Sequence, residues 1–182
     1  MDRSAALVRL LAEDQAEDRA VSAGEPAWVA LRARDRARRE AVMALLADGW
    51  PEDADALYAA AWVLNHGDLS EEAALGSRLA ARAAELGRPG ARWLAAAALD
   101  RSLMYAGRPQ KYGTNIVPDG VGWRLWDVDP ATTDAERRAN DVPPLAEMQA
   151  RAVAITTPQP DMAEAPESLR RAMRRWGTLR PV

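Results

Sequence analysis

Several residue types are absent or scarce in this chain of 182 residues. It has no cysteine, which excludes a disulfide framework and thiolate metal sites. It has no phenylalanine, one histidine and a single lysine, Lys111, although arginine is abundant. No apolar run approaches the roughly 20 residues that a membrane span needs, and no signal-peptide pattern opens the chain. We therefore expect a cytoplasmic protein without a membrane partner.

The overall charge is small, with a formal net charge of -3. A general nucleic-acid-binding domain is strongly basic, so nucleic acid is not the expected partner. The segment "RARDRARRE" (residues 32–40) is the local exception. It is interpreted either as a solvated helix with i,i+4 pairs such as Asp35–Arg39 or as a patch for acidic ligands or nucleic acid. The charge pattern favours the solvated helix.

Apolar periodicity and Gly/Pro boundaries predict five long helices, over about 3–20, 26–48, 52–66, 70–86 and 90–106. Short connections make neighbouring helices antiparallel. The alanine runs at 59–61 and 95–98 permit close approach of backbones, and Ser70 is the predicted N-cap of the fourth helix. The fold class is therefore mainly α: a compact antiparallel helical bundle or helical-hairpin array.

The helical pattern stops after residue 106. The segments "TNIV" (114–117) and "GWRLWDV" (122–128) predict two short strands joined at Pro118-Asp119-Gly120, a β-hairpin-like insertion. Thr133 and Glu136 then have the spacing of a capping box for a short helix, and a further helix is predicted over 144–154.

The C-terminal part of the sequence differs in composition from the rest. We expect one helical domain over 1–155, followed over 156–182 by a Pro-rich linker or extended tail and a short basic amphipathic helix. This helix, "SLRRAMRRWG", carries Leu169, Met173 and Trp176 on one side. That side is expected to dock on the body of the protein or to form a homodimer.

His66 is the first candidate for chemistry, because histidine titrates near neutral pH and suits acid–base work. It ends the third predicted helix, with Asp68 two residues later and Trp62 one turn earlier, placed to pack on the imidazole. The alternative is that the imidazole caps the last carbonyls of the helix or satisfies a buried polar group. A lone histidine without cysteine argues against zinc, and neither a metal site nor a cofactor motif is predicted.

The loop "GRPQKYGT" (107–114) is the second candidate. Arg108 and Lys111 can bind an anion, and Tyr112 can stack on a ligand or donate a hydrogen bond. Gln110 adds a further polar contact. Alternatively, these polar groups pair with backbone and hold the hairpin in place.

The segment "WDVDP" (126–130) adds two carboxylates. Asp127 and Asp129 lie on one side of an extended chain, where paired carboxylates can share a proton or hold a divalent ion. The alternative is that one of them caps the turn into Thr133.

Several motifs are shared with a known family. They are "GWP" (49–51), "AAWVLNHGD" (60–68), "GRPQKYGT" (107–114), "DVDP" (127–130) and "ERRANDVPPLAEM" (136–148). The chain resembles a bacterial, mainly actinobacterial, helical domain-of-unknown-function family, whose pattern has Gln where this chain has Asn65. The resemblance implies a helical fold and no particular reaction. It also implies that His66, Asp68 and the 110–114 segment belong to one feature.

These observations predict a small cofactor-independent enzyme that acts on a polar or anionic small molecule by His-assisted acid–base chemistry, with bacterial specialised metabolism as its setting. The expected catalytic residues are His66, Asp68 and Tyr112. The expected substrate-binding residues are Trp62, Arg108, Gln110, Lys111 and Asp127. The alternative is a helical-hairpin protein-interaction or ligand-binding module without catalysis. The enzyme hypothesis requires His66 and the 110–112 loop to line one hollow.

Overall fold

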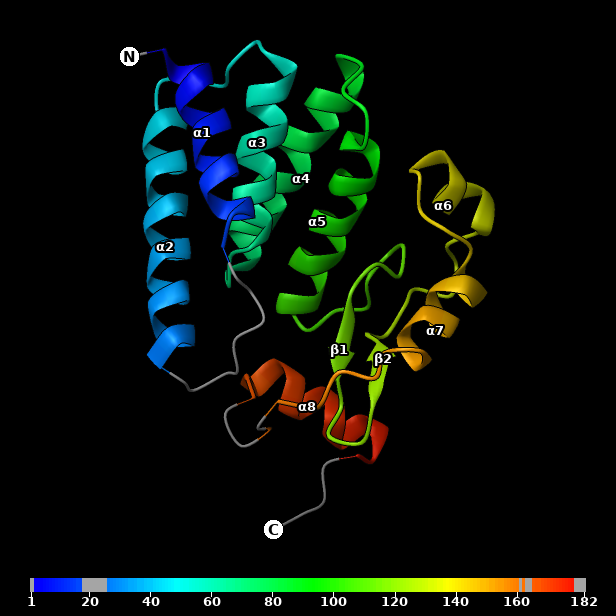
Figure 1. Ribbon diagram of the computed structural model, residues 1–182. Coiled ribbons are helices and arrows are strands. Elements are labelled where there is room, and N and C mark those ends of the chain that lie inside the picture. The colour runs from blue at the N-terminus through cyan, green and yellow to red at the C-terminus, as the bar shows by residue number, and fades with distance from the viewer. Residues whose placement is uncertain (1, 18–25, 161, 163–164, 179–182) are drawn as a thin grey trace.

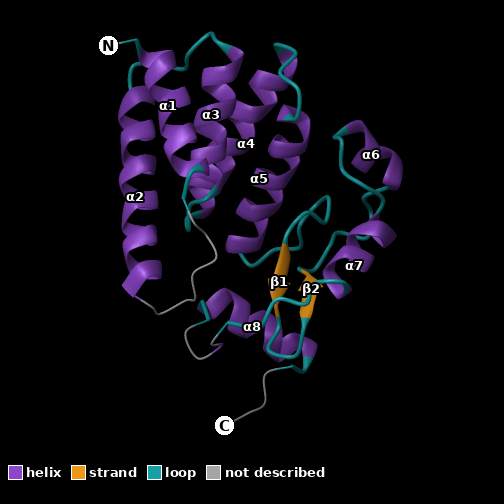
Figure 2. Cartoon of the chain, in the orientation of Figure 1, coloured by secondary structure: helices purple, strands orange, loops and turns teal. Residues whose placement is uncertain are grey.

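Five helices lie side by side and form a bundle (Figures 1 and 2). The computed structural model describes residues 2–17, 26–160, 162 and 165–178. The helices of the bundle are α1 (Arg3–Gln15), α2 (Pro26–Leu46), α3 (Ala54–Asn65), α4 (Ser70–Glu85) and α5 (Ala91–Tyr105). The mainly α class is confirmed. The first helix ends at Gln15, earlier than predicted, and residues 18–20 lie outside the described part of the chain.

Helix α3 is the centre of this bundle, because it contacts α1, α2, α4 and α5. Its inward side is built from small residues, and Ala56, Leu57 and Leu64 are completely buried. A Cβ atom at Gly76 of α4 would lie 3.1 Å from the carbonyl oxygen of Ala61, so glycine at this position lets the two helices approach closely. The core is therefore alanine-rich and depends on close backbone packing rather than on large side chains.

Local signals set most helix starts. Asp53 caps α3 by accepting the amide hydrogen of Ala56 at 2.8 Å. Ser70, however, is not a cap: Leu69 occupies the N-cap position of α4. The Ser70 hydroxyl instead donates to the carbonyl oxygen of Ser102 at 3.0 Å, which ties α4 to α5. This tertiary contact explains why the predicted cap is wrong.

The predicted hairpin is present. Strands β1 (Ile116–Pro118) and β2 (Trp123–Leu125) pair antiparallel, with Val117 opposite Arg124. Pro118 belongs to β1, so the turn begins at Asp119, whose carboxylate accepts two backbone N–H groups within the turn. Helices α6 (Asp134–Ala139) and α7 (Leu145–Val153) follow the hairpin, and α6 starts with the predicted capping box.

Helix α8 (Glu167–Trp176) packs against the hairpin (Figure 1). Trp176 meets Trp126 edge-on, with ring centroids 5.5 Å apart, and its indole N–H donates to Asp127 at 2.7 Å. Ala172 and Met173 are fully buried. The predicted apolar side of this helix is thus covered by its own chain, and we no longer propose a homodimer through it. Over the described ranges, no helix combines the length and the apolar composition required to cross a membrane.

Candidate functional site

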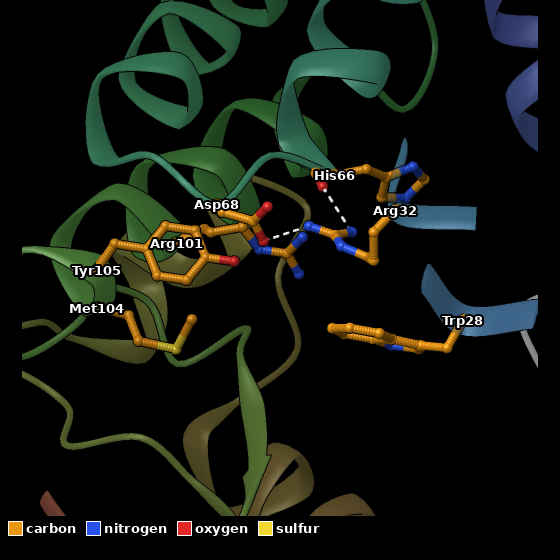
Figure 3. A pocket seen from close by; sticks show the side chains of 7 residues that line it. All are labelled: Trp28, Arg32, His66, Asp68, Arg101, Met104 and Tyr105. Atoms are coloured by element: carbon orange, nitrogen blue, oxygen red, sulfur yellow. Dashed lines mark hydrogen bonds and ion pairs between the residues drawn. The ribbon is translucent and has the colours of Figure 1, made fainter. Parts of the chain in front are cut away.

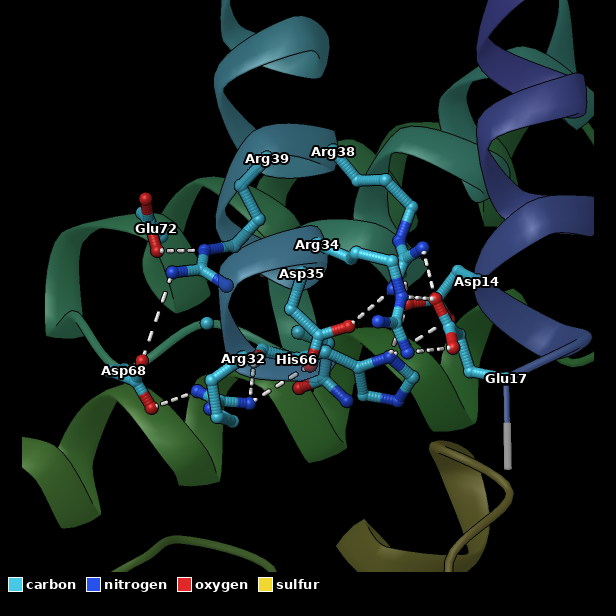
Figure 4. A network of polar contacts seen from close by, with 12 residues as sticks. Asp14, Glu17, Arg32, Arg34, Asp35, Arg38, Arg39, His66, Asp68 and Glu72 are labelled. Carbon is cyan, nitrogen blue, oxygen red and sulfur yellow. Dashed lines mark hydrogen bonds and ion pairs between the residues drawn. The ribbon is translucent and has the colours of Figure 1, made fainter. Parts of the chain in front are cut away.

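One face of the charge-dense middle of α2 is buried, which corrects the expectation from the sequence for Asp35, Arg38 and Arg39. Arg34, Arg36 and Glu40 are exposed as expected. Asp35 is 1% exposed and accepts hydrogen bonds from Arg32 at 3.1 Å and Arg38 at 2.6 Å (Figure 4). Arg38 and Arg39 are also buried. Because Leu31, Asp35, Arg38 and Val42 share one face of the helix, the apolar stripe of α2 contains charges in its middle.

On the α1 side, Asp14 of α1 holds His66. Its Nδ1 lies 2.9 Å and 3.0 Å from the two carboxylate oxygens of Asp14, which is buried. Arg38 reaches the same carboxylate at 3.7 Å and binds Glu17 at 2.8 Å. Hydrogen bonds from Arg34 and Arg38 lower the pKa of Glu17 to about 2. Ion pairs between side chains therefore hold the end of α1 against α2, and the contact with Asp14 orients the imidazole of His66.

On the α4 side, the network ends at Asp68. Arg32 forms an ion pair with Asp68 and also donates to the carbonyl oxygen of His66 at 3.3 Å (Figure 4). Arg39 lies 2.8 Å from Glu72 and 3.8 Å from Asp68. Although burial opposes it, the hydrogen bond to Asp68 raises the pKa of Arg32. The loop between α3 and α4 is thus fixed to α2.

A solvent-open pocket of about 300 Å³ lies next to this network (Figure 3). It lies where the end of α3, the following loop, α2 and α5 meet. Its walls are formed by Trp28, Arg32, His66, Asp68, Arg101, Met104 and Tyr105. The size is at the lower end of the range for small-molecule sites, and the lining combines charged with aromatic groups.

Arg101 of α5 is the most unusual group in the pocket. Its guanidinium donates to the carbonyl oxygen of Asn65 and, at 3.3 Å, to the side-chain oxygen of Asn115. No Asp or Glu of the described residues forms an ion pair with it, and Nη2 makes no hydrogen bond to a described residue. Burial lowers the pKa of Arg101. Arg101 is partly buried, and the nearby carboxylate of Asp68 opposes the effect of burial on its pKa. A partly desolvated cation without an ion-pair partner of its own favours binding of an anion.

Two further polar groups of the pocket, Tyr105 and Asp68, already have partners. The Tyr105 hydroxyl donates to the carbonyl oxygen of Gly67 at 3.0 Å, and burial raises the pKa of this phenol. Asp68 is taken by Arg32. Two guanidinium groups and one carboxylate leave one positive charge on the pocket lining.

His66 and Asp68, both candidates from the sequence, line this pocket. Trp62 lies behind it: its ring centroid is 5.7 Å from that of His66 and 6.0 Å from that of Trp93, in a cluster that also includes Tyr58. The expected packing of Trp62 on the imidazole is therefore present. Trp62 supports the ring and does not face the pocket.

The "GRPQKYGT" loop does not line the pocket. The side chain of Gln110 is fully buried and bonds to backbone only, at Asn115 and Trp126. Tyr112 is buried against Ala96 and Val142. The loop polar groups hold the hairpin in place, which is the alternative stated from the sequence. We therefore no longer propose Gln110 or Tyr112 as ligand contacts. The condition stated for the enzyme hypothesis, that His66 and the 110–112 loop line one hollow, is not met at this pocket, so any chemistry proposed for His66 has to proceed without the loop.

Other residues in this region also have structural partners. Arg108 is exposed, and its carbonyl oxygen accepts the indole N–H of Trp126. The Nζ of Lys111 lies 4.0 Å from Glu136. Asp127 accepts hydrogen bonds from Arg175 and Trp176 and so anchors α8. None of these three residues is among the pocket residues.

A buried carboxylate on α5 organises the loop. Asp100 is 0% exposed and accepts the N–H groups of Lys111, Tyr112 and Thr114 at 2.7 to 3.0 Å, together with the Thr114 hydroxyl. Burial raises the pKa of Asp100, while these hydrogen bonds act in the opposite direction. Asp100 and the buried Gln110 side chain therefore hold the irregular loop together.

The site cannot be assigned by similarity. Comparison of the chain with protein-family models, with curated proteins and with solved structures found no match. The family resemblance drawn from the motifs stays a prediction, and the function has to be argued from the site itself. Within the ranges that the structure describes, no group of three or more His, Asp or Glu side chains is placed to hold a metal ion.

Sequence reasoning missed five of the pocket residues and the partner of His66. Arg32 and Arg101 are two arginines among many, and no local pattern distinguishes them. A signal did exist for Asp35, because it lies at helical spacing between the apolar residues Leu31 and Val42. Continuing the apolar stripe of this helix from Leu31 to Val42 would have predicted that Asp35 is buried.

Proposed function

We propose that the protein binds a small organic anion in the pocket between α2, α3 and α5. The observation that carries the proposal is the Arg101 guanidinium, which is partly buried, has no ion-pair partner among the described residues and lines the pocket. Burial of a cation without a partner is costly, so a bound anion would recover part of that cost. Arg32 supplies a second guanidinium, already oriented by Asp35 and Asp68.

The hydrogen-bonding geometry of Arg101 supports this proposal. A guanidinium presents paired N–H donors that match a carboxylate or phosphate oxygen pair. Arg101 is held by two hydrogen bonds, so little conformational entropy is lost when a ligand binds. The pocket is therefore preorganised for an anion, although it is open to solvent and small.

Arg101→Gln tests the proposal. Titration of ¹⁵N-labelled protein with acetate should give saturable chemical-shift changes around the pocket, with millimolar affinity. In Arg101→Gln the affinity should fall by roughly tenfold or more, since a charge-assisted hydrogen bond is lost. Arg92→Gln is the matched control: it lies on α5, pairs with Asp141 at the surface and should bind acetate normally.

Two outcomes would contradict the proposal. One is wild-type protein whose pocket signals do not move with acetate or phosphate. The other is Arg101→Gln that keeps its native spectrum and binds as tightly as the wild type.

A second function, acid–base catalysis on the bound anion, is favoured by the contact between His66 and Asp14. The carboxylate of Asp14, 2.9 Å from Nδ1, accepts a hydrogen bond from this nitrogen and favours the tautomer that carries the proton on Nδ1. Nε2 then carries the lone pair, and it makes no hydrogen bond to a described residue. This arrangement of a carboxylate behind an imidazole orients a general base.

His66→Gln separates catalysis from binding. Wild-type protein and variant would be incubated in D₂O with a panel of carboxylates that carry an acidic C–H bond, and deuterium incorporation measured by mass spectrometry. If His66 is a base, incorporation by the wild type exceeds that of the variant by about 10²-fold or more, while both bind the ligand. Binding without incorporation in the wild type would leave a ligand-binding module only.

A further inference from the structure

We propose that the ligand of this pocket is a planar aromatic monocarboxylate, with its ring stacked on the indole of Trp28 and its carboxylate on Arg101. The inference rests on the proposed function, because it assumes that Arg101 binds an anion. It adds the chemical class of the ligand and names Trp28 as the residue that selects it.

The first argument is the position of Trp28. It lies in the first turn of α2 and lines the pocket. Figure 3 shows its indole ring across an open gap from the guanidinium groups of Arg32 and Arg101, with Met104 and Tyr105 on the opposite side. The pocket therefore has a cationic wall facing an aromatic wall. A flat ring that carries an anionic group fits between them, since an aromatic ring and a guanidinium both stack on planar groups.

The second argument is that Trp28 has no role within the described residues that would explain it. Trp62, Trp93, Trp126 and Trp176 have ring or cation contacts, and Trp123 donates to the carbonyl oxygen of Thr157 at 2.9 Å. Trp50 has no such contact with a described residue, but it is exposed and does not line the pocket. Trp28 makes no ring contact and no side-chain hydrogen bond with any described residue. A half-buried indole without partners is costly at a solvent-open position, and aromatic side chains of this kind are enriched at binding sites.

The charge and the size of the pocket favour a small monoanion. The pocket lining has one positive charge in excess, and Asp68 would repel a dianion such as a phosphate monoester. A monocarboxylate balances that charge. A pocket of about 300 Å³ is small for a drug-sized ligand and suits a molecule with one or two rings.

The test compares three carboxylates of the same charge: acetate, cyclohexanecarboxylate and benzoate. Dissociation constants would be measured by ¹⁵N chemical-shift titration. We expect benzoate to bind roughly tenfold more tightly than acetate, because ring stacking adds to the ion pair. Benzoate should also bind more tightly than cyclohexanecarboxylate, which has similar apolar area but no flat face.

Trp28→Ala should remove the preference for benzoate and leave acetate binding unchanged. Trp28→Phe should keep most of the preference, which shows that the effect is stacking and not a change of fold. Trp50→Ala, at an exposed tryptophan that is not among the pocket residues, should match the wild type.

The outcomes distinguish the two proposals. Equal affinity for acetate and benzoate, or a preference that survives Trp28→Ala, would overturn the aromatic class while anion binding stands. Equal affinity for benzoate and cyclohexanecarboxylate would also overturn it, because apolar contact alone would then explain binding. Absence of any anion binding, or binding that is unaffected by Arg101→Gln, would overturn the proposed function itself.

Discussion

Asp100→Ala is expected to lower the free energy of unfolding by about 3–5 kcal/mol. The carboxylate is fully buried and accepts three backbone N–H groups, of Lys111, Tyr112 and Thr114, and the Thr114 hydroxyl. Alanine would leave these donors without an acceptor, and each buried donor left unsatisfied costs on the order of 1 kcal/mol or more. Urea unfolding followed by tryptophan fluorescence measures the change.

Arg92→Ala is the control for this prediction. Arg92 lies on the exposed side of the same helix, and its ion pair with Asp141 is solvent-exposed, so the expected change is below about 1 kcal/mol. Asp100→Asn gives a finer test: its amide offers one acceptor oxygen, and its NH₂ group would face backbone donors. If Asp100→Ala unfolded at the same urea concentration as the wild type, the loop would not depend on this anchor.

The second large effect is expected for Asp35→Ala, which should destabilise the protein by about 3–5 kcal/mol. Asp35 is 1% exposed and neutralises Arg38 and Arg32 from within the core. Removing one partner of a buried ion pair leaves the other charge uncompensated, and that penalty exceeds the loss of the pair itself. Thermal or urea unfolding reports the change in stability.

Arg36→Ala is the matched control on the same helix. Arg36 is exposed, so the change should stay within about 0.5 kcal/mol. A second readout is acetate binding, because Asp35 orients Arg32 at the pocket. An Asp35→Ala variant as stable as the wild type would show that the charges of α2 are solvated, as the sequence pattern first indicated.

Most of the fold could be predicted from local patterns in the sequence. The Gly and Pro boundaries, the cap at Asp53 and the capping box of Thr133 and Glu136 act between neighbours, so they can be recognised without tertiary structure. The hairpin was predicted for the same reason. The prediction of Ser70 as an N-cap was wrong because its hydroxyl bonds to a residue of another helix, and no local pattern contains that information.

The site was less accessible to prediction. His66 and Asp68 stood out by residue type, and both line the pocket. Arg101 and Trp28 are brought together only by the packing of α2 against the end of α3 and α5, at positions far apart in the chain. Their importance comes from the partners they lack, and a sequence does not show which arginine is left without a carboxylate.

The loop around Gln110 shows the opposite error. Its composition is typical both of a ligand site and of a backbone turn held by side chains. The two cases differ only in the residues against which the loop packs. Here these include the carboxylate of Asp100, on a helix that is otherwise largely apolar. Polar residues in a loop therefore indicate irregular backbone more directly than they indicate chemistry.

The packing of α8 on the hairpin has a consequence for how the chain folds during synthesis. The indole of Trp176 reaches Asp127 across 49 positions of sequence, and it also covers Trp126. During synthesis the hairpin emerges from the ribosome before α8, so this side of the hairpin stays open to water until α8 follows. The bundle can form co-translationally, whereas the hairpin half reaches its native packing only after the α8 residues are synthesised.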